Sequence, residues 1–226
     1  YGLGNLFRQD GNPDTAELVY KAVLEERPDY AYAYSGLAQI QLAQGKTDEA
    51  EKLLIKASDI MPDHTFLEQL ADIYKATGNA ASATGTEALV LKSFAQHDND
   101  GWNCDKEFAA FCCNHDINLT EALQRAEREY NRRPANIDAL DTYAWALYKN
   151  GRATDALPLI ENALRLGTRN PVLHYHAGII FKAVGERGKS AAELEKAIHI
   201  NPFIHILYRD SIQQALASMS SLAYSN

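Results

Sequence analysis

The stretch from Tyr34 to Pro62, "YSGLAQIQLAQGKTDEAEKLLIKASDIMP", decides the fold. Two segments with helical spacing of apolar residues flank Gly45. Glycine takes the left-handed conformation that ends a helix and lets the chain turn, and Pro62 cannot continue the second helix. The stretch therefore predicts a pair of antiparallel helices. The apolar stripe of such a pair cannot be buried within the pair, so the chain needs neighbours of the same kind.

The same pattern returns along the chain. It begins again at Leu140 as "LDTYAWALYKNGRATDALPLIENALRLG" and at His174 as "HYHAGIIFKAVGERGKSAAELEKAIHINP". A less regular copy, "LEQLADIYKATGNAASATGTEALVLKSFA", begins at Leu67, and a shortened one, "YGLGNLFRQDGNPDTAELVYKAVLEERP", opens the chain. Three kinds of fixed point mark the period: glycines that close first helices (Gly11, Gly45, Gly78, Gly151, Gly185), small residues that open second helices (Ala16, Ala50, Ala83, Ala122, Ala156, Ser190) and prolines that end units (Pro28, Pro62, Pro134, Pro202). The dominant spacing is 34 residues, as between Gly11 and Gly45.

This pattern resembles the tetratricopeptide repeat, in its bacterial-type form. The first unit carries the family's motif in Leu3, Gly4, Phe7, Ala16, Tyr20 and Pro28, and the last carries it in Ala177, Gly178, Phe181 and Gly185. The resemblance implies an all-α fold, a right-handed α-solenoid of stacked antiparallel helix pairs. We expect a single solenoid over residues 1–226, with repeats at about 1–30, 31–63, 64–102, 103–136, 137–170 and 171–204 and a C-terminal capping helix at 205–220.

The two ends of the chain carry separate signals. "YGLGNLFRQ" matches the family from its fifth position, so we expect a longer native chain upstream of Tyr1. At the other end, helical spacing joins Ile212, Ala215, Leu216 and Met219, while Gln213, Gln214 and Ser218 lie opposite. This amphipathic pattern predicts the capping helix.

The middle of the chain departs from the regular period. The third to fourth repeat takes 39 residues, and we expect the five extra ones in a polar turn at "DNDG", Asp98 to Gly101. In the fourth unit the predicted first helix runs from Asn103 to His115, and Ile117 occupies the turn position that glycine holds elsewhere. The third unit's second helix carries Gly85 and Glu87, so we expect it to be the least stable.

Composition narrows the classes of partner. The formal charge of −8 argues against a nucleic acid, which needs a concentrated basic surface. No apolar run approaches the roughly 18 residues of a membrane helix, so we expect no direct membrane insertion. Three cysteines make no disulfide framework and leave the compartment undecided. The oligomeric state also stays open.

The stretch "HDNDGWNCDKEFAAFCCNHD", His97 to Asp116, is the one place that resembles a chemical site. Cys104 and His115 are eleven residues apart, roughly 16 Å along a helix, too far to share one ion. Cys112 and His115 form a plausible pair, but two ligands do not close a zinc site. We therefore expect no metal, no cofactor and no catalytic residue, and keep a metal- or thiol-dependent activity at Cys104, Cys112 and His115 as an alternative.

What remains is recognition of another protein or peptide. In the family that the repeats resemble, the first helix of each pair lines a concave groove. Register carried over from the family predicts these groove residues: Tyr32, Ser35, Gln39, Glu68, Asp72, Lys75, Cys104, Glu107, Phe111, Asn114, Asp141, Trp145, Tyr148, Lys149, Tyr175, Ile179 and Lys182. The C-terminal half is an aromatic strip with a few charges, a composition suited to anchoring a peptide. We expect a non-enzymatic interaction scaffold. A purely structural repeat segment of a larger protein is the other alternative.

Overall fold

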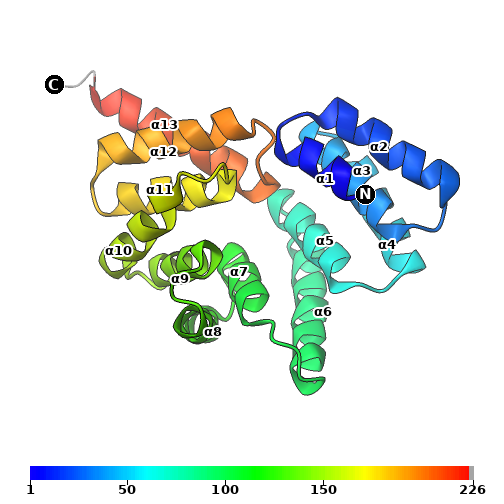
Figure 1. Ribbon diagram of the computed structural model, residues 1–226, viewed down its shortest axis with the longest axis horizontal. Coiled ribbons are helices and arrows are strands. Elements are labelled where there is room, and N and C mark those ends of the chain that lie inside the picture. The colour runs from blue at the N-terminus through cyan, green and yellow to red at the C-terminus, as the bar shows by residue number, and fades with distance from the viewer. Residues whose placement is uncertain (224–226) are drawn as a thin grey trace. The chain divides into compact units, whose positions relative to one another are not determined.

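A computed structural model describes residues 1–223 of the chain, with side chains as far as Ser218. The side chain of Met219, part of the expected capping helix, and residues 224–226 lie outside the described residues. Helices dominate, and no strand occurs in the described part. Their bounds are α1 Gly2–Gln9, α2 Pro13–Glu26, α3 Ala31–Ala43, α4 Thr47–Ile60, α5 His64–Ala76, α6 Ala80–Asn99, α7 Asp105–His115, α8 Leu119–Arg132, α9 Ile137–Lys149, α10 Ala153–Ala163 with a short 3₁₀ turn Leu164–Leu166, α11 Pro171–Ala183, α12 Arg187–Ile200 and α13 Ile206–Ala223 (Figure 1).

The chain divides into two compact units, Tyr1–Ala95 and Gln96–Asn226. Within the units, consecutive helices pack as pairs: α1 with α2, α3 with α4, α7 with α8, α9 with α10, and α11 with α12. Within each unit, neighbouring pairs also pack together, as α2 does against α3 and α10 against α11. The expected fold class, an α-solenoid of stacked helix pairs, is confirmed. The expectation of one continuous solenoid stays a prediction.

Glycines and other small residues permit the closest contacts between helices. Tyr20 is fully buried, and its ring lies against Gly4 of α1 and Gly36 of α3. A Cβ atom added to either glycine would lie 2.5 Å from that ring. In the second unit Gly178 faces the buried Leu194 in the same way. Glycine in these positions therefore sets how near the helices approach, since any side chain would push them apart.

The turns between paired helices follow the expected glycine rule, with one exception. Gly45 has a φ of +76° and Gly151 a φ of +75°, the left-handed conformation that ends a helix. After α7 the left-handed residues are Asp116 and Asn118, not Ile117. A β-branched side chain makes positive φ costly, whereas Asp and Asn tolerate it. The turn of the fourth repeat therefore begins one residue early, at Asp116. The helix before this turn begins at Asp105 rather than at Asn103.

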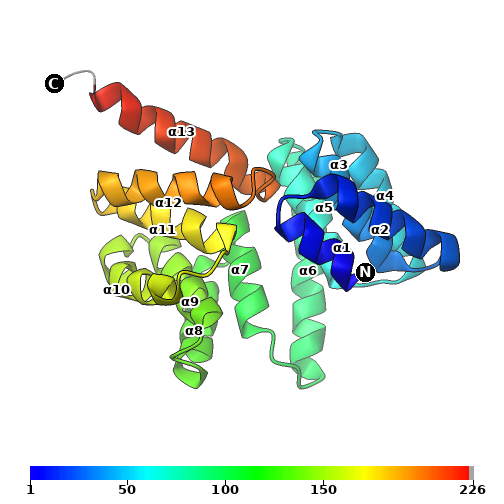
Figure 2. The same ribbon diagram turned by 45° about the horizontal axis from the view of Figure 1, so that its top comes forward.

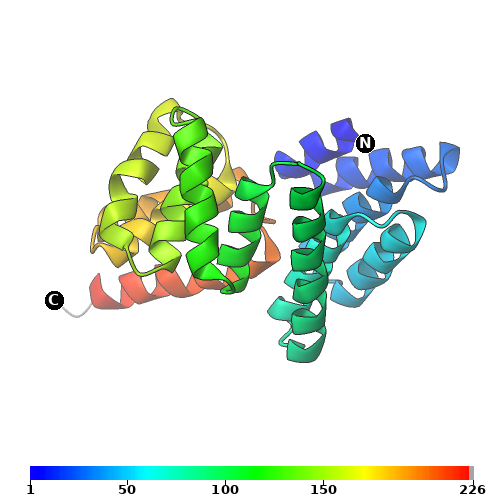
Figure 3. The same ribbon diagram turned by 90° about the horizontal axis from the view of Figure 1, so that it is seen from below.

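The extra residues between the third and fourth units lengthen a helix. Helix α6 has 20 residues where α4 has 14, and Figure 3 shows it as one unbroken rod. Asp98 and Asn99, expected in the turn, belong to its last turn, and the chain reverses at Gly101 with a φ of +81°. The reason is local: no proline follows here to stop the second helix, unlike Pro62 after α4.

Helix α13 lies beyond α11 and α12 (Figure 2). Its Tyr208, Ile212 and Ala215 are buried, while Gln213 and Gln214 are exposed, as the amphipathic pattern predicted. Apolar residues of the second unit form a continuous core, which includes Leu140, Leu147, Ile160, Leu173 and Ile180. No helix of the described chain has the length and apolar character that crossing a bilayer requires. Helix α13 also supplies one wall of the site described next.

Candidate functional site

A pocket of about 460 Å³ lies between α9, α11 and α13. Its lining contains six of the predicted groove residues: Trp145, Tyr148, Lys149, Tyr175, Ile179 and Lys182. Ala183, Ser211, Gln214 and Ala215 complete it. Three alternate helices therefore bring together residues that are up to 70 positions apart in the sequence, from Trp145 to Ala215.

Aromatic rings form the inner wall of the pocket. Trp145 is 3% exposed and stacks on Tyr148, with ring centroids 5.0 Å apart. Behind it the imidazole of His176 lies parallel at 4.2 Å. Tyr175 stacks on Tyr208 of α13 at 4.2 Å, and its hydroxyl donates to Ser211 Oγ at 3.2 Å. Burial raises the pKa of Tyr148 and of Tyr175, so both phenols stay neutral at physiological pH. These rings belong both to the packing between repeats and to the pocket wall.

Charged groups stand at the rim and beneath the wall. Lys149 Nζ pairs with Asp116 Oδ1 at 2.5 Å and lies 5.3 Å from the Trp145 ring centroid. Lys182 is exposed. The rim therefore holds two cations against one carboxylate. Asp141, a predicted groove residue, is buried, with its Oδ1 2.9 Å from His176 Nδ1. It fixes the imidazole that backs Trp145 and does not line the pocket.

The remaining candidates of the second unit lie on α7 and do not line the pocket. Phe111 is buried and stacks on His115 at 4.3 Å. Asn114 Oδ1 accepts a hydrogen bond from Trp145 Nε1 at 3.1 Å, which helps to hold the indole in place. Glu107 is exposed and pairs with Lys106 at 3.3 Å. Asn114 thus supports the pocket from behind, while Phe111 is core.

The candidates of the first unit lie on α3 and α5. The Tyr32 hydroxyl donates to Asp63 Oδ2 at 2.5 Å, and this hydrogen bond raises the pKa of Tyr32 to about 12. Gln39 Nε2 donates to Gln69 Oε1 at 2.7 Å, and Gln69 in turn donates to Ser35 Oγ at 2.8 Å. Partly buried positions on α5 hold the other three candidates, Glu68, Asp72 and Lys75. They belong to a separate unit from the pocket and form no part of it.

Sequence reasoning missed the wall contributed by α13. That helix was interpreted as a cap, with its polar residues turned to solvent. Ser211 and Gln214 are three residues apart, so they share one face of the helix with Ala215 next to it. In the sequence, the polar residues Ser211 and Gln214 beside the apolar Ala215 could have indicated a pocket wall. Helix α13 thus forms one wall of the pocket.

The cysteine region has different geometry from a metal or thiol site. Cys112 and Cys113 are fully buried, and burial raises the pKa of the Cys113 thiol to about 12. Cys104 Sγ lies 3.7 Å from His97 Nδ1, and burial also raises the pKa of this thiol. A raised pKa keeps a thiol protonated and weakly nucleophilic. Across the described residues, no three His, Cys, Asp or Glu side chains are placed to hold a metal ion.

The fold and the pocket define a class: an all-helical repeat protein whose site is assembled from neighbouring helix pairs. Residues 7–70 match the family model of the tetratricopeptide repeat. This stretch of the chain therefore consists of tetratricopeptide repeats. Such repeats generally mediate contacts between proteins and typically serve as scaffolds without catalysis.

Two curated relatives share part of the chain. Cellulose synthase 1 operon protein C of Komagataeibacter xylinus is 29% identical over 161 residues, which are 68% of this chain and 11% of that protein. Cellulose synthase operon protein C of Komagataeibacter sucrofermentans is 28% identical over 149 residues, 63% of this chain and 10% of that protein. The chain thus spans about a tenth of the length of the curated relatives that it matches.

Solved structures show the same fold. A chain of the APC/C hetero-tetramer Cut9–Hcn1 superposes with a TM-score of 0.61 at 12% identity, over 94% of this chain and 41% of that one. PilW, a widely conserved type IV pilus biogenesis factor, superposes with a TM-score of 0.54 at 15% identity, over 91% of this chain and 94% of that one. At these identities the likeness concerns the fold alone.

Proposed function

We propose that this protein is an interaction scaffold and that the pocket between α9, α11 and α13 receives a segment of a partner protein. The observation that carries the proposal is the convergence of Trp145, Tyr148 and Tyr175 on one cavity beside Lys149 and Lys182. Rigid aromatic walls bury an apolar side chain at low entropic cost. The excess of positive charge at the rim favours a carboxylate on the same segment.

The size of the cavity limits what it receives. About 460 Å³ accommodates one or two large side chains of a peptide and not a folded domain. The segment therefore inserts an aromatic or large aliphatic anchor and places an acidic residue near Lys182. Most of the affinity comes from the anchor, while the ion pair fixes the direction of the peptide.

Peptides selected on the immobilised protein from a random phage-displayed library test the proposal. Trp145→Ala with Tyr148→Ala removes the wall, but these rings are also core, so exposed lining residues give the sharper variants. Lys182→Glu and Gln214→Glu should each weaken binding of the selected peptides at least about fivefold, since each places a negative charge at the rim. Gln213→Glu, the adjacent exposed residue outside the lining, is the matched control.

Selected peptides should share an apolar anchor next to an acidic residue. Equal binding by the Gln214→Glu and Gln213→Glu variants, with helicity retained in both, rejects the pocket as the binding site. Failure of the library to yield any peptide that competes at this pocket also counts against the proposal.

A second candidate function follows from the curated relatives. We propose as an alternative that the chain is a scaffold section of a longer protein that is encoded in a cellulose synthase operon. The observation in its favour is the alignment over 161 residues with cellulose synthase 1 operon protein C. Sequencing the gene with its neighbours tests it. A reading frame without a longer repeat array, or neighbours unrelated to cellulose synthesis, contradicts it.

A further inference from the structure

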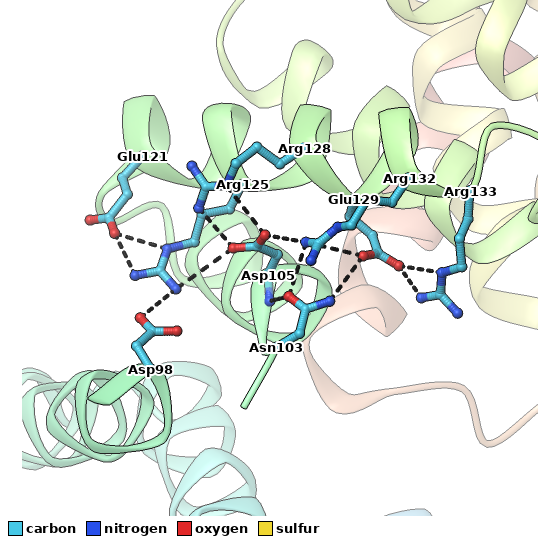
Figure 4. Close-up of polar contacts among 9 residues, drawn as sticks. All are labelled: Asp98, Asn103, Asp105, Glu121, Arg125, Arg128, Glu129, Arg132 and Arg133. Carbon is cyan, nitrogen blue, oxygen red and sulfur yellow. Dashed lines mark hydrogen bonds and ion pairs between the residues drawn. The ribbon is translucent and has the colours of Figure 1, made fainter. Parts of the chain in front are cut away.

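Helix α8 carries a row of arginines that the pocket does not use. Arg125, Arg128, Arg132 and Arg133 follow one another along it, and none lines the pocket (Figure 4). Contacts within the protein already occupy Arg125. It pairs with Asp98 and Glu121 at 2.8 Å each, and its guanidinium lies 3.9 Å from the Phe108 ring centroid. The side chains of the other three are 55%, 47% and 54% exposed, in chain order.

Two buried carboxylates hold these three guanidinium groups in place. Arg128 donates to Asp105 at 2.8 Å, and Arg132 bridges Asp105 and Glu129. Arg133 pairs with Glu129, whose side chain is only 1% exposed. The wider network of four arginines and four carboxylates has no net charge, but these three guanidinium groups are exposed while Asp105 and Glu129 are buried. The part of the network that faces solvent here is therefore cationic. Because a guanidinium has five N–H donors, each arginine keeps donors beyond those that these contacts use.

An exposed tryptophan precedes one residue of this network in the chain. Trp102 is 70% exposed and directly precedes Asn103. Asn103 belongs to the same network, because its Oδ1 accepts from Arg132 at 2.9 Å and its Nδ2 donates to Glu129 at 3.3 Å. The loop is therefore fixed beside α8. Trp and Arg are the residue types most enriched where binding energy concentrates at protein interfaces.

We propose that Trp102, Arg128, Arg132 and Arg133, which we call the arginine face, dock an acidic segment of a partner protein. The carboxylates of that segment meet the guanidinium groups, and an apolar side chain covers Trp102. Asp105 and Glu129 orient the arginines in advance, so little side-chain entropy is lost on binding. The overall negative charge of the chain disfavours a nucleic acid in the same place.

Fluorescence anisotropy at low salt tests the arginine face, with a short labelled peptide rich in Glu and Leu as the probe. Trp102→Ala should weaken binding at least about fivefold, since an exposed side chain can be truncated without disturbing the core. Arg128→Gln combined with Arg133→Gln should weaken it similarly, and added salt should weaken binding to the unaltered protein. Arg152→Gln is the matched control, because Arg152 is 53% exposed and paired with Asp155 on another helix.

Three results of this binding experiment would overturn the proposal. The proposal is overturned if the Trp102 and control variants bind the probe equally, or if a peptide with Gln in place of Glu binds as well as the probe. Tighter binding of an oligonucleotide than of the acidic peptide also overturns it, in favour of a nucleic-acid surface. If the arginine double variant loses its helicity, Trp102→Ala and the salt dependence decide. Lys182→Glu in the pocket should leave probe binding at the arginine face unchanged, which keeps the two proposed sites separate.

Discussion

Gly178 shows how much of this fold depends on the absence of one methyl group. A Cβ atom there would lie 2.5 Å from Leu194 Cγ and 3.2 Å from the backbone oxygen of Ser190. Leu194 is fully buried, and Ser190 Oγ donates a hydrogen bond to the Gly178 carbonyl oxygen at 2.7 Å, which holds the two helices close together. The two helices α11 and α12 must therefore separate to admit a side chain.

We expect Gly178→Ala to lower the free energy of unfolding by about 1–2 kcal/mol, because the overpacking cost exceeds the gain in helix propensity. Gly188→Ala is the control: it also lies in a helix of the same unit, but an added Cβ meets nothing within 4 Å. That variant should be neutral or more stable by up to about 1 kcal/mol. Urea denaturation of both variants checks this, and equal stability of the two would contradict the account.

The titration of Tyr32 makes part of the stability of the protein depend on pH. Its hydrogen bond to Asp63 raises the pKa of the phenol from 10.0 to about 12. A raised folded-state pKa means that the contribution to stability is present below about pH 10 and is lost as the pH rises towards about 12. Asp63→Asn should bring the pKa of Tyr32 back towards 10.0, because the charged acceptor is gone.

Carbon-13 NMR of labelled tyrosine measures this titration, with Tyr32→Phe to assign the signal. Asparagine retains an oxygen that can cap α5 by accepting from the Thr65 backbone, as Asp63 does at 2.9 Å, so the variant should keep its fold. Asp59→Asn removes an exposed carboxylate elsewhere and serves as the control. An unchanged Tyr32 titration in the Asp63 variant would refute the assigned cause.

Helix α6 buries few large apolar side chains for its length. Of its 20 residues, the buried ones are Ala83, Thr86, Val90 and Phe94, two of them small or polar. It also contains Gly85, where an added Cβ would meet nothing within 4 Å. A long helix with little buried apolar surface and an internal glycine opens readily.

We expect amide hydrogen exchange to be fastest over residues 81–100 among the helical segments, as measured by mass spectrometry. Gly85→Ala should slow this exchange and stabilise the helix by about 0.5–1 kcal/mol, since nothing crowds the added methyl group. Gly188→Ala in α12 should leave exchange in α6 unchanged. Uniform protection across all helices would show that α6 is not a weak element.

At the scale of elements, the sequence predicted what periodicity and turn residues encode. Helix pairs, their glycine turns and their buried small residues follow from spacing alone, as Ala50 at 0% exposure illustrates. The length of α6 was not predicted, because the polar residues Asp98 and Asn99 suit a helix end as well as a turn. The early turn at Asp116 was not predicted either. The repeat register pointed to Ile117, whereas positive φ is less costly for its neighbours Asp116 and Asn118.

Across the second unit, helix α13 covers a surface that α11 and α12 would otherwise expose. Tyr208 is 4% exposed, Ile212 1% and Ala215 2%, and Tyr208 stacks on Tyr175 of α11. Removing the chain from Ile206 onward exposes this surface of α11 to water. We expect the truncated protein to be less soluble and less stable than the full chain, as sedimentation and thermal unfolding would show.

Point variants separate the loss of this helix from the loss of its contacts. Tyr208→Ala should cost about 3 kcal/mol of unfolding free energy, because it empties a buried aromatic site. Gln213→Ala, on the exposed side of the same helix, should cost almost nothing. A truncated chain that stays monomeric and equally stable would mean that α13 is dispensable.

The sequence predicted the residues of the candidate site that lie on the first helix of each pair, and only in part. The register placed Trp145, Tyr148 and Tyr175 on one strip, and all three line the pocket. The same register included Asp141 and Phe111, which are buried against other side chains. Periodicity reports which face a residue occupies. It does not report whether a neighbouring side chain, such as His176 over Asp141, already covers that face.

The pocket has no wall that belongs to a single repeat, because α9, α11 and α13 come from successive parts of the stack. Its dimensions are therefore set by the offset between neighbours as much as by the side chains themselves. Inserting a further helix pair between those walls would alter no lining residue and yet produce a different cavity. Descendants of such a gene can acquire new specificities by recombination of whole units, long before point substitutions accumulate.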